Sequence, residues 1–196
     1  MPVTTQMTTQ VTNQITTHIA TLETLLQQWR PSFGQDYLAY RNHVYRIINH
    51  CIVYAEKNDI ALSHDTLEII AIAAAFHDIG IWLDNTFDYL QPSAQRANNY
   101  LVREGKADWV ETVTSMINEH HKVTAFSSDK KDLVEMFRQA DWIDVSMGML
   151  SFQTPRANIR KIRKIFPYEG FHKRLIQLTL VHSLKAPLNP LPMFKW

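Results

Sequence analysis

The sequence contains little glycine and cysteine and has no long alternating pattern. Only five of its 196 residues are glycine, and no segment alternates apolar and polar residues over the length of a strand, which argues against β-sheets. The single cysteine, Cys51, cannot form an internal disulfide, and its apolar neighbours in IINHCIVYA favour a small buried side chain over a nucleophile. We therefore expect an α-helical protein in the reducing cytoplasm.

Two classes of partner are disfavoured by further absences. The longest apolar run, 69–76, is much shorter than the roughly 20 residues of a bilayer-spanning helix, and the initial MPVTTQMTTQVTNQITT lacks the basic-then-apolar order of a signal peptide. The formal net charge is only +1, so the chain has no strong field to attract nucleic acid. We expect neither a membrane nor a nucleic acid as partner, and the composition leaves the oligomeric state open.

The apolar residues that are present recur at helical spacing and predict an all-α bundle in one domain. We assign 1–34 to an N-terminal segment and first helix, 35–150 to a core, and 151–196 to C-terminal helices and a tail of the same domain. The helices are expected within 17–29, 36–58, 63–80, 91–105, 108–121, 131–146, 155–166 and 168–184.

Several residues suggest where these helices begin and end. Pro31 with Gly34 is expected to end the first helix, and Gly80 the third. Asp65 and Glu68, three residues apart, resemble a capping box at the start of the third helix. The basic run 156–164 is interleaved with isoleucines, so its charges are expected on the solvated face of an amphipathic helix rather than on a phosphate site. The proline-bearing tail 185–196 is expected to be an extended strap.

Four potential metal ligands lie on or beside predicted buried helix faces: His43, His77, Asp78 and Asp141. Burying such polar groups without a partner costs several kcal/mol. One divalent ion would satisfy all four, and the mixed nitrogen and oxygen donors suit Mn²⁺, Fe²⁺, Co²⁺, Ni²⁺, Zn²⁺ or Mg²⁺. The adjacent His77 and Asp78 would diverge by about 100° on a helix, so sharing an ion requires a helix end close by.

The order His, His-Asp, Asp resembles the HD-domain superfamily of metal-dependent phosphohydrolases. The segments YRNHVYRI, AAAFHDIG and RQADWIDVSMG match the family's three ligand segments, and the likeness extends through PSAQRA and INEHH, covering roughly 36–150. The resemblance implies an all-helical core that binds one divalent ion through His43, His77, Asp78 and Asp141. It also implies hydrolysis of a nucleotide or another small phosphate ester by a metal-activated water.

The same resemblance raises the question of the remaining catalytic residues. Asp78 is counted among them because the ion depends on it, and Asp84 is the candidate acid, although the family usually places an acidic residue closer to the His-Asp pair. A capping or solvated role for Asp84 is the alternative. His120 resembles a pocket histidine of one bacterial branch, whereas His121 is expected to face solvent.

Three basic residues lie near the ligand segments in the sequence, and we expect Arg41, Arg46 and Lys122 to bind the substrate phosphate together with His120. Asp144, one turn after Asp141, is a candidate for orienting a ligand or the attacking water, with a surface carboxylate as the alternative.

Two other functions remain open at this point. Some proteins of the HD fold are di-iron oxygenases, which need two more histidines between the His-Asp pair and the final aspartate. Only His120 and His121 lie in that interval, and adjacent residues form a poor ligand pair on a helix. The other alternative is a non-catalytic module that binds a metal or a nucleotide.

Overall fold

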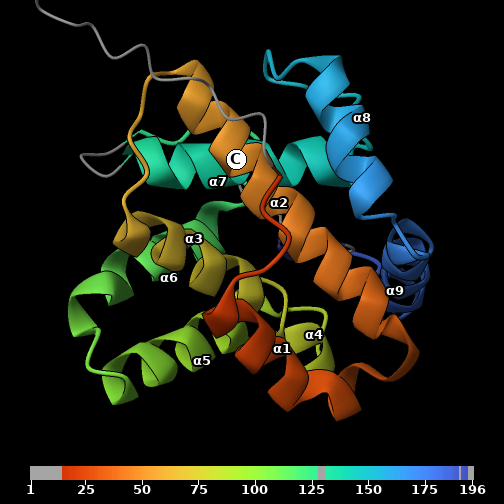
Figure 1. The fold of residues 1–196 in the computed structure, drawn as a ribbon. Coiled ribbons are helices and arrows are strands. Elements are labelled where there is room, and N and C mark those ends of the chain that lie inside the picture. Colours follow the sequence, from red (N-terminus) through yellow and green to blue (C-terminus); the bar gives the residue numbers. More distant parts are fainter. Residues whose placement is uncertain (1–14, 128–130, 190, 194–196) are drawn as a thin grey trace, which may run out of the picture.

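The computed structural model describes residues 15–127, 131–189 and 191–193, and all regular secondary structure within these ranges is helical (Figure 1). The expected all-α, single-domain bundle is therefore confirmed. The α-helices are α1 (Ala20–Phe33), α2 (Tyr37–Lys57), α3 (His64–Phe76), α4 (Gly80–Leu83), α5 (Leu90–Arg103), α6 (Val110–Glu119), α7 (Lys131–Val145), α8 (Arg156–Ile165) and α9 (Phe171–Lys185), and Gly34–Asp36 and Ala107–Trp109 form 3₁₀ turns.

Helices α2 and α3 form the centre of the bundle. Helix α2 packs along α7 and also contacts α3, α8 and α9, while α3 packs against α1, α5 and α6. The segment 70–76 of α3 is apolar all round and buried, as expected for a helix surrounded by others. Its four alanines allow neighbouring backbones to approach closely. Polar residues near the ends of α3 and on the inner faces of α2 and α7 consequently meet in the interior.

The N-terminal helices end at Gly34 and begin at Ser63 as predicted, but the roles expected of Pro31 and of the Asp65–Glu68 pair are not observed. Helix α1 continues through Pro31 to Phe33, because a proline in the last turn removes only one hydrogen bond, and the chain leaves the helix at Gly34, whose φ is +55°. Helix α3 is capped by Ser63, whose hydroxyl accepts from the Thr66 amide at 3.0 Å. The expected capping box is absent there.

The segment His64–Leu83 is long and apolar enough to cross a membrane by length and composition alone. It contains α3, a turn and α4, and 67% of its most apolar window is buried inside the protein. The apolar composition of α3 is therefore explained by its position at the centre of this bundle.

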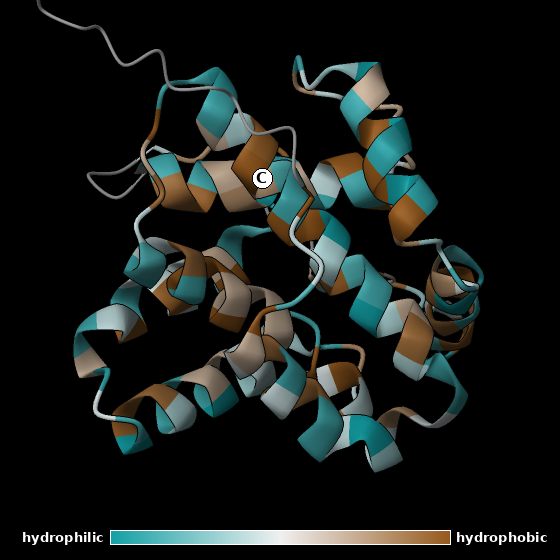
Figure 2. Ribbon diagram, viewed as in Figure 1, coloured by the Kyte–Doolittle hydropathy of each residue, from teal (hydrophilic) through white to brown (hydrophobic). Residues whose placement is uncertain are grey.

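The C-terminal region has the predicted pattern where the structure describes it. Apolar and polar residues alternate along α8 (Figure 2), with Ile159 and Ile162 buried against the bundle and the basic side chains outside. The amphipathic assignment of 156–164 is thus confirmed. After α9 the described part of the tail has no helix, and Met193 packs against Ile81 and Tyr89. Residues 190 and 194–196 of the predicted strap lie outside the described ranges.

Candidate metal centre

The centre begins where α3 stops. The helix ends at Phe76, the residues 77–79 form a turn, and Gly80 begins α4 instead of ending α3. The turn is tightened by bonds from the Ile79 amide to the Phe76 carbonyl (3.2 Å) and from the Ile81 amide to the Asp78 carbonyl (3.0 Å). His77 and Ile79 keep right-handed helical dihedral angles, so the chain stays tightly wound here, and the side chains of His77 and Asp78 approach each other at their outer ends. His77 Nε2 lies 3.2 Å from Asp78 Oδ2.

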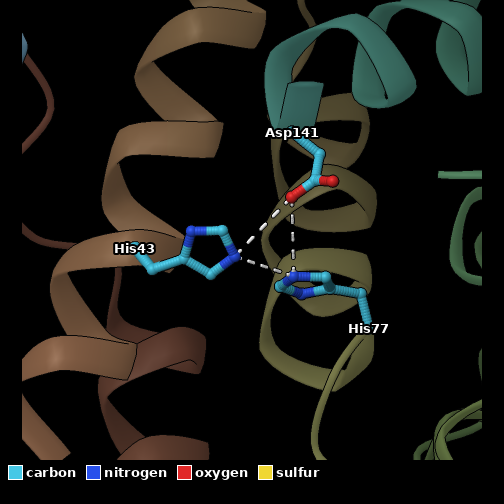
Figure 3. A group of neighbouring side chains, drawn as sticks. All are labelled: His43, His77 and Asp141. Atoms are coloured by element: carbon cyan, nitrogen blue, oxygen red, sulfur yellow. Dashed lines mark hydrogen bonds and ion pairs between the residues drawn. The ribbon is translucent and has the colours of Figure 1, made fainter. Parts of the chain in front are cut away.

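The structure brings the four predicted ligands together. His43 comes from α2 and Asp141 from α7, and Figure 3 shows both side chains directed at His77. His43 Nε2 lies 3.0 Å from His77 Nε2 and 3.6 Å from Asp141 Oδ1, and it lies 3.9 Å from Asp78 Oδ2. All four residues are buried. Their donor atoms are therefore close enough to share an ion.

Two further residues belong to the same cluster, which we call the His/Asp cluster. His120 Nε2 lies 3.4 Å from Asp78 Oδ1, and His121 Nδ1 lies 3.6 Å from Asp141 Oδ2. Three sets of three residues could each hold a metal ion, because within each set the donor atoms lie within 4.8 Å of one another. They are His43, His77 and Asp141; His77, Asp78 and His120; and His120, His121 and Asp141.

Hydrogen bonds on the outer side of three imidazoles determine which nitrogen faces the centre. His77 Nδ1 donates to the Ala74 carbonyl at 2.8 Å, and His120 Nδ1 donates to the Ile117 carbonyl at 2.7 Å. His43 Nδ1 donates to Asp144 Oδ2 at 2.7 Å. Since an oxygen of this kind only accepts, each Nδ1 carries a proton and each Nε2 faces the centre, where it offers a lone pair whenever the imidazole is neutral. This is how metal-binding histidines are held in proteins.

The inward-facing atoms fit a bound cation. His120 Nε2, Asp78 Oδ1 and both carboxylate oxygens of Asp141 are buried without a hydrogen-bond partner. The lone pairs of His43 and His77 face each other at 3.0 Å, which is repulsive unless a proton or a metal ion lies between them. Buried acceptors that lack a donor are costly. A positive ion at their centre removes both problems at once, so the His/Asp cluster is a candidate metal centre.

The titration of the cluster agrees with this interpretation. Burial lowers the pKa of His43 to about 4, so this imidazole stays neutral and able to act as a ligand. Burial raises the pKa of Asp141 to about 7, which means that the carboxylate needs a positive neighbour to remain charged. Burial alone would lower the pKa of His77, but the carboxylates of Asp78 and Asp141 outweigh it and raise the pKa to about 9, so a proton occupies His77 Nε2 at neutral pH until a metal ion displaces it.

Asp144 and Arg46 lie next to the cluster on the side of His43 Nδ1, which faces away from the centre. Arg46 Nε and Nη2 donate to the two oxygens of Asp144 at 2.5 and 2.9 Å, and Arg46 Nη1 donates to the Phe166 and Pro167 carbonyls. Arg46 is therefore a buried structural residue, and its predicted contact with the substrate phosphate is wrong because all its donors point toward Asp144 and this backbone. Asp144 is buried and bonded to His43 Nδ1, so it orients a predicted ligand, which is the first of the two alternatives, and is not a surface carboxylate.

The expectation that His121 faces solvent is also wrong. The side chain is buried, its ring lies 3.9 Å from that of His120, and its Nε2 is 2.7 Å from the Tyr89 hydroxyl. Helix α6 ends at Glu119, and the two histidines form the turn that follows it, with their donor atoms within 4.8 Å of each other and of Asp141. Adjacent histidines were predicted to be a poor pair because a continuing helix was assumed. No sequence signal pointed to Tyr89.

Two candidates lie away from the cluster. Asp84 accepts two hydrogen bonds from Arg96 at 2.8 Å, and these bonds lower the pKa of the exposed carboxyl group. A group held as a carboxylate is a poor proton donor, so this geometry favours the solvated alternative for Asp84 over the catalytic acid. Arg41 pairs with Glu23 of α1 and not with the cluster. Lys122 directly follows His121, and its carbonyl accepts from Arg138 and Trp142; phosphate binding by its side chain stays a prediction.

Comparison with known proteins gave no match to a family model, to a curated protein sequence or to a solved structure. The resemblance to the HD-domain superfamily therefore depends on the quoted segments and on the placement of their residues.

Proposed function

We propose that this protein is a metal-dependent phosphohydrolase of the HD type that acts on a small phosphate ester. The observation that carries the proposal is the set of three inward-facing Nε2 atoms in one buried volume with Asp78 Oδ1 and both oxygens of Asp141, none of which has a hydrogen-bond partner. The order of the ligand segments, which resembles that of HD phosphohydrolases, supports the reaction class. The proposal includes a cytoplasmic location, which the free, buried Cys51 suits.

His43, His77, Asp78 and Asp141 would hold the ion, which supplies a Lewis acid that polarises a phosphoryl oxygen and acidifies water. The residues of the chain provide the geometry. Asp144 and the Ala74 carbonyl keep the rings of His43 and His77 from rotating. The burial of the cluster excludes bulk water and strengthens each electrostatic interaction with the phosphate.

Hydrolysis replaces the bond between phosphorus and the ester oxygen by a bond to the oxygen of water, and the departing oxygen takes up a proton. His121 of the cluster and the neighbouring Tyr89 are hydrogen-bonded to each other at 2.7 Å. When His121 Nε2 donates to the Tyr89 oxygen, the phenol proton is free for a hydrogen bond to an ester oxygen. They therefore take the place near the leaving group that the sequence had suggested for Asp84.

The experiment that tests the proposal compares Asp78→Asn with Asp84→Asn. Protein purified without chelators should contain a divalent metal and release phosphate from a panel of phosphate esters. Asp78→Asn should lose metal and turnover together, because the amide removes the negative charge that lies between His77 and His120. Asp84→Asn, which changes only a surface pair, should keep both.

Circular dichroism would verify that both variants are folded. Retention of full metal content and wild-type turnover by folded Asp78→Asn would refute the proposed centre. A metal-free wild-type protein without turnover would favour the non-catalytic module.

One observation favours a second candidate, a di-iron oxygenase. His120, His121 and Asp141 form a separate set of donor atoms beside the set of His43, His77 and Asp141, so the cluster offers ligands for two ions. Two irons per chain with oxygen uptake would establish this function, whereas phosphate release without oxygen uptake would exclude it.

A further inference from the structure

An apolar cavity of about 430 Å³ lies beside the His/Asp cluster. Its wall combines residues of α9, the end of α7, the segment before α5 and the C-terminal tail. The apolar side chains of the wall include Phe87, Val145, Leu175, Ile176, Leu180 and Met193. Its volume and its mostly apolar wall are typical of a small-molecule binding site.

The cavity borders the cluster at His121. This residue lines the cavity and at the same time lies 3.6 Å from Asp141. It is also the most exposed member of the cluster, at 8%, whereas the other five are at most 3% exposed. Tyr89, the partner of His121, lines the cavity as well. The cluster therefore meets accessible space on the side of this apolar cavity.

The chemistry of the wall distinguishes between kinds of substrate. Within the described residues the cavity is lined by no lysine, arginine, aspartate or glutamate, and its polar side chains are Tyr89, His121, His172 and Thr179. Of these, His172 is already bonded to the Asp144 carbonyl, at 3.1 Å. A ribose and a base carry several hydrogen-bonding groups that would lose water here without replacement, which is costly. A hydrocarbon group would gain free energy from the same surface.

Helix α9 leaves apolar residues uncovered at this site. Ile176 and Leu180 line the cavity and are each 61% exposed. Their exposure means that a hydrocarbon in the cavity would cover protein surface that water now contacts. Leu184, one turn beyond Leu180, is 87% exposed but does not line the cavity. The helix thus offers two exposed leucines, of which only Leu180 lines the cavity.

We propose that the cavity binds the hydrocarbon group of an amphiphilic phosphate monoester whose phosphate lies at the His/Asp cluster. This inference rests on the proposed phosphohydrolase function and narrows its substrate class from small phosphate esters in general to esters with an apolar leaving group. Water attacks the phosphorus, the bond to the ester oxygen breaks, and a proton on that oxygen yields a free alcohol and inorganic phosphate.

The test is a series of ethyl, butyl, hexyl and octyl phosphates, with adenosine and thymidine monophosphates for comparison. We expect kcat/KM to rise about threefold to fourfold per methylene, which corresponds to ~0.8 kcal/mol, until the cavity is filled. The nucleotides should be poorer substrates than octyl phosphate. Calorimetry with octylphosphonate and metal-free protein should show binding with a negative heat-capacity change, the mark of apolar burial.

Leu180→Asn and Leu184→Asn provide the matched variants. Leu180→Asn should reduce the ratio of octyl to ethyl phosphate turnover by about fivefold to tenfold, since a polar amide replaces part of the apolar wall. Leu184→Asn should leave the ratio unchanged. Equal turnover of all chain lengths and of nucleotides would overturn the inference while the phosphohydrolase function stands. No turnover of any ester would instead refute that function.

The uncovered face of α9 could alternatively pack against a second copy of the chain. A dimer that both leucine variants dissociate, together with no dependence on chain length, would assign the face to self-association and overturn the inference. A monomer, or a dimer that neither variant affects, with the predicted chain-length dependence would support it.

Discussion

The ring orientation of three histidines in this protein is set by the oxygen that accepts a hydrogen bond from Nδ1. His77 and His120 are each bonded to a carbonyl three residues earlier in the chain, whereas His43 is bonded to Asp144, 101 residues later. The first two are local contacts that any similar helix end could provide. The third depends on the packing of α2 against α7, which makes Asp144 the residue through which the fold controls the centre.

Asp144→Asn should therefore weaken the centre without removing a proposed ligand. The variant leaves the buried Arg46 guanidinium without its carboxylate and weakens the bond that orients His43. We expect metal affinity to fall by about 10-fold to 100-fold and stability to fall by about 3–5 kcal/mol, as for other broken buried ion pairs. A competition titration with a chromogenic chelator and a urea melt would measure these two quantities.

The control for Asp144→Asn is Asp84→Asn, because Asp84 is also bonded to two nitrogens of one arginine but lies at the surface. Loss of that pair should cost at most about 1 kcal/mol and leave metal affinity unchanged. An Asp144→Asn protein with wild-type metal affinity would contradict the positioning role of Asp144.

Among the structural elements, the break between α3 and α4 has the most direct effect on the centre. Gly80 follows the turn that carries His77 and Asp78, its amide donates to Ser93 Oγ at 3.0 Å, and its α-carbon faces Tyr89. A Cβ at Gly80 would lie 3.0 Å from the Tyr89 carbonyl oxygen and 3.2 Å from Ser93 Oγ. Glycine is required here by this close packing and not by a positive φ.

Gly80→Ala should push α4 away from the segment that begins α5. Overpacking of this kind costs about 1–3 kcal/mol, and the shift would displace Asp78 and Tyr89, so metal affinity should fall as well. Thermal unfolding and a metal titration would measure both effects.

Gly105→Ala distinguishes a general loss of stability from damage to the centre. Gly105 has φ of +71° and no heavy atom within 4 Å of an added Cβ. Its replacement should cost about 1–2 kcal/mol of backbone strain but leave metal affinity intact. If Gly80→Ala behaved in the same way, α4 would not position the centre.

At the scale of the whole molecule, the buried cluster couples metal binding to folding. Its donor atoms come from α2, the turn after α3, the end of α6 and α7, so unfolding separates them. A ligand at 100 times its Kd stabilises the folded state by about 2.7 kcal/mol. For a chain of this size we expect the Tm to rise by about 5–10 °C when a suitable metal is added and to fall back with a chelator.

Asp141→Asn is the informative comparison for this measurement. It removes a buried carboxylate whose two oxygens lack hydrogen-bond partners, so the metal-free variant should melt at a higher temperature than the metal-free wild type. It should also respond little to added metal. A metal-dependent rise in Tm as large as that of the wild type would show that the stabilising ion binds elsewhere.

Local patterns were sufficient for the helices and for four members of the cluster. The apolar spacing placed His43 and Asp141 on inner helix faces, and the abrupt change from 70–76 to His77 and Asp78 marked the end of a buried helix. The exact ends were harder to predict. Pro31 and Gly80 usually end helices, but here the position in the last turn and the contact with Tyr89 decided otherwise.

The sequence by itself determined that this protein is a helical bundle and which side chains face its core, because periodicity and capping act over a few residues. Only the tertiary structure decided that Arg46 binds Asp144, 98 residues away, and that His121 turns inward beside Tyr89. It also created the apolar cavity, whose wall joins α9 to the segment before α5. Such contacts join segments distant in the chain, and no local pattern records which distant segments will meet.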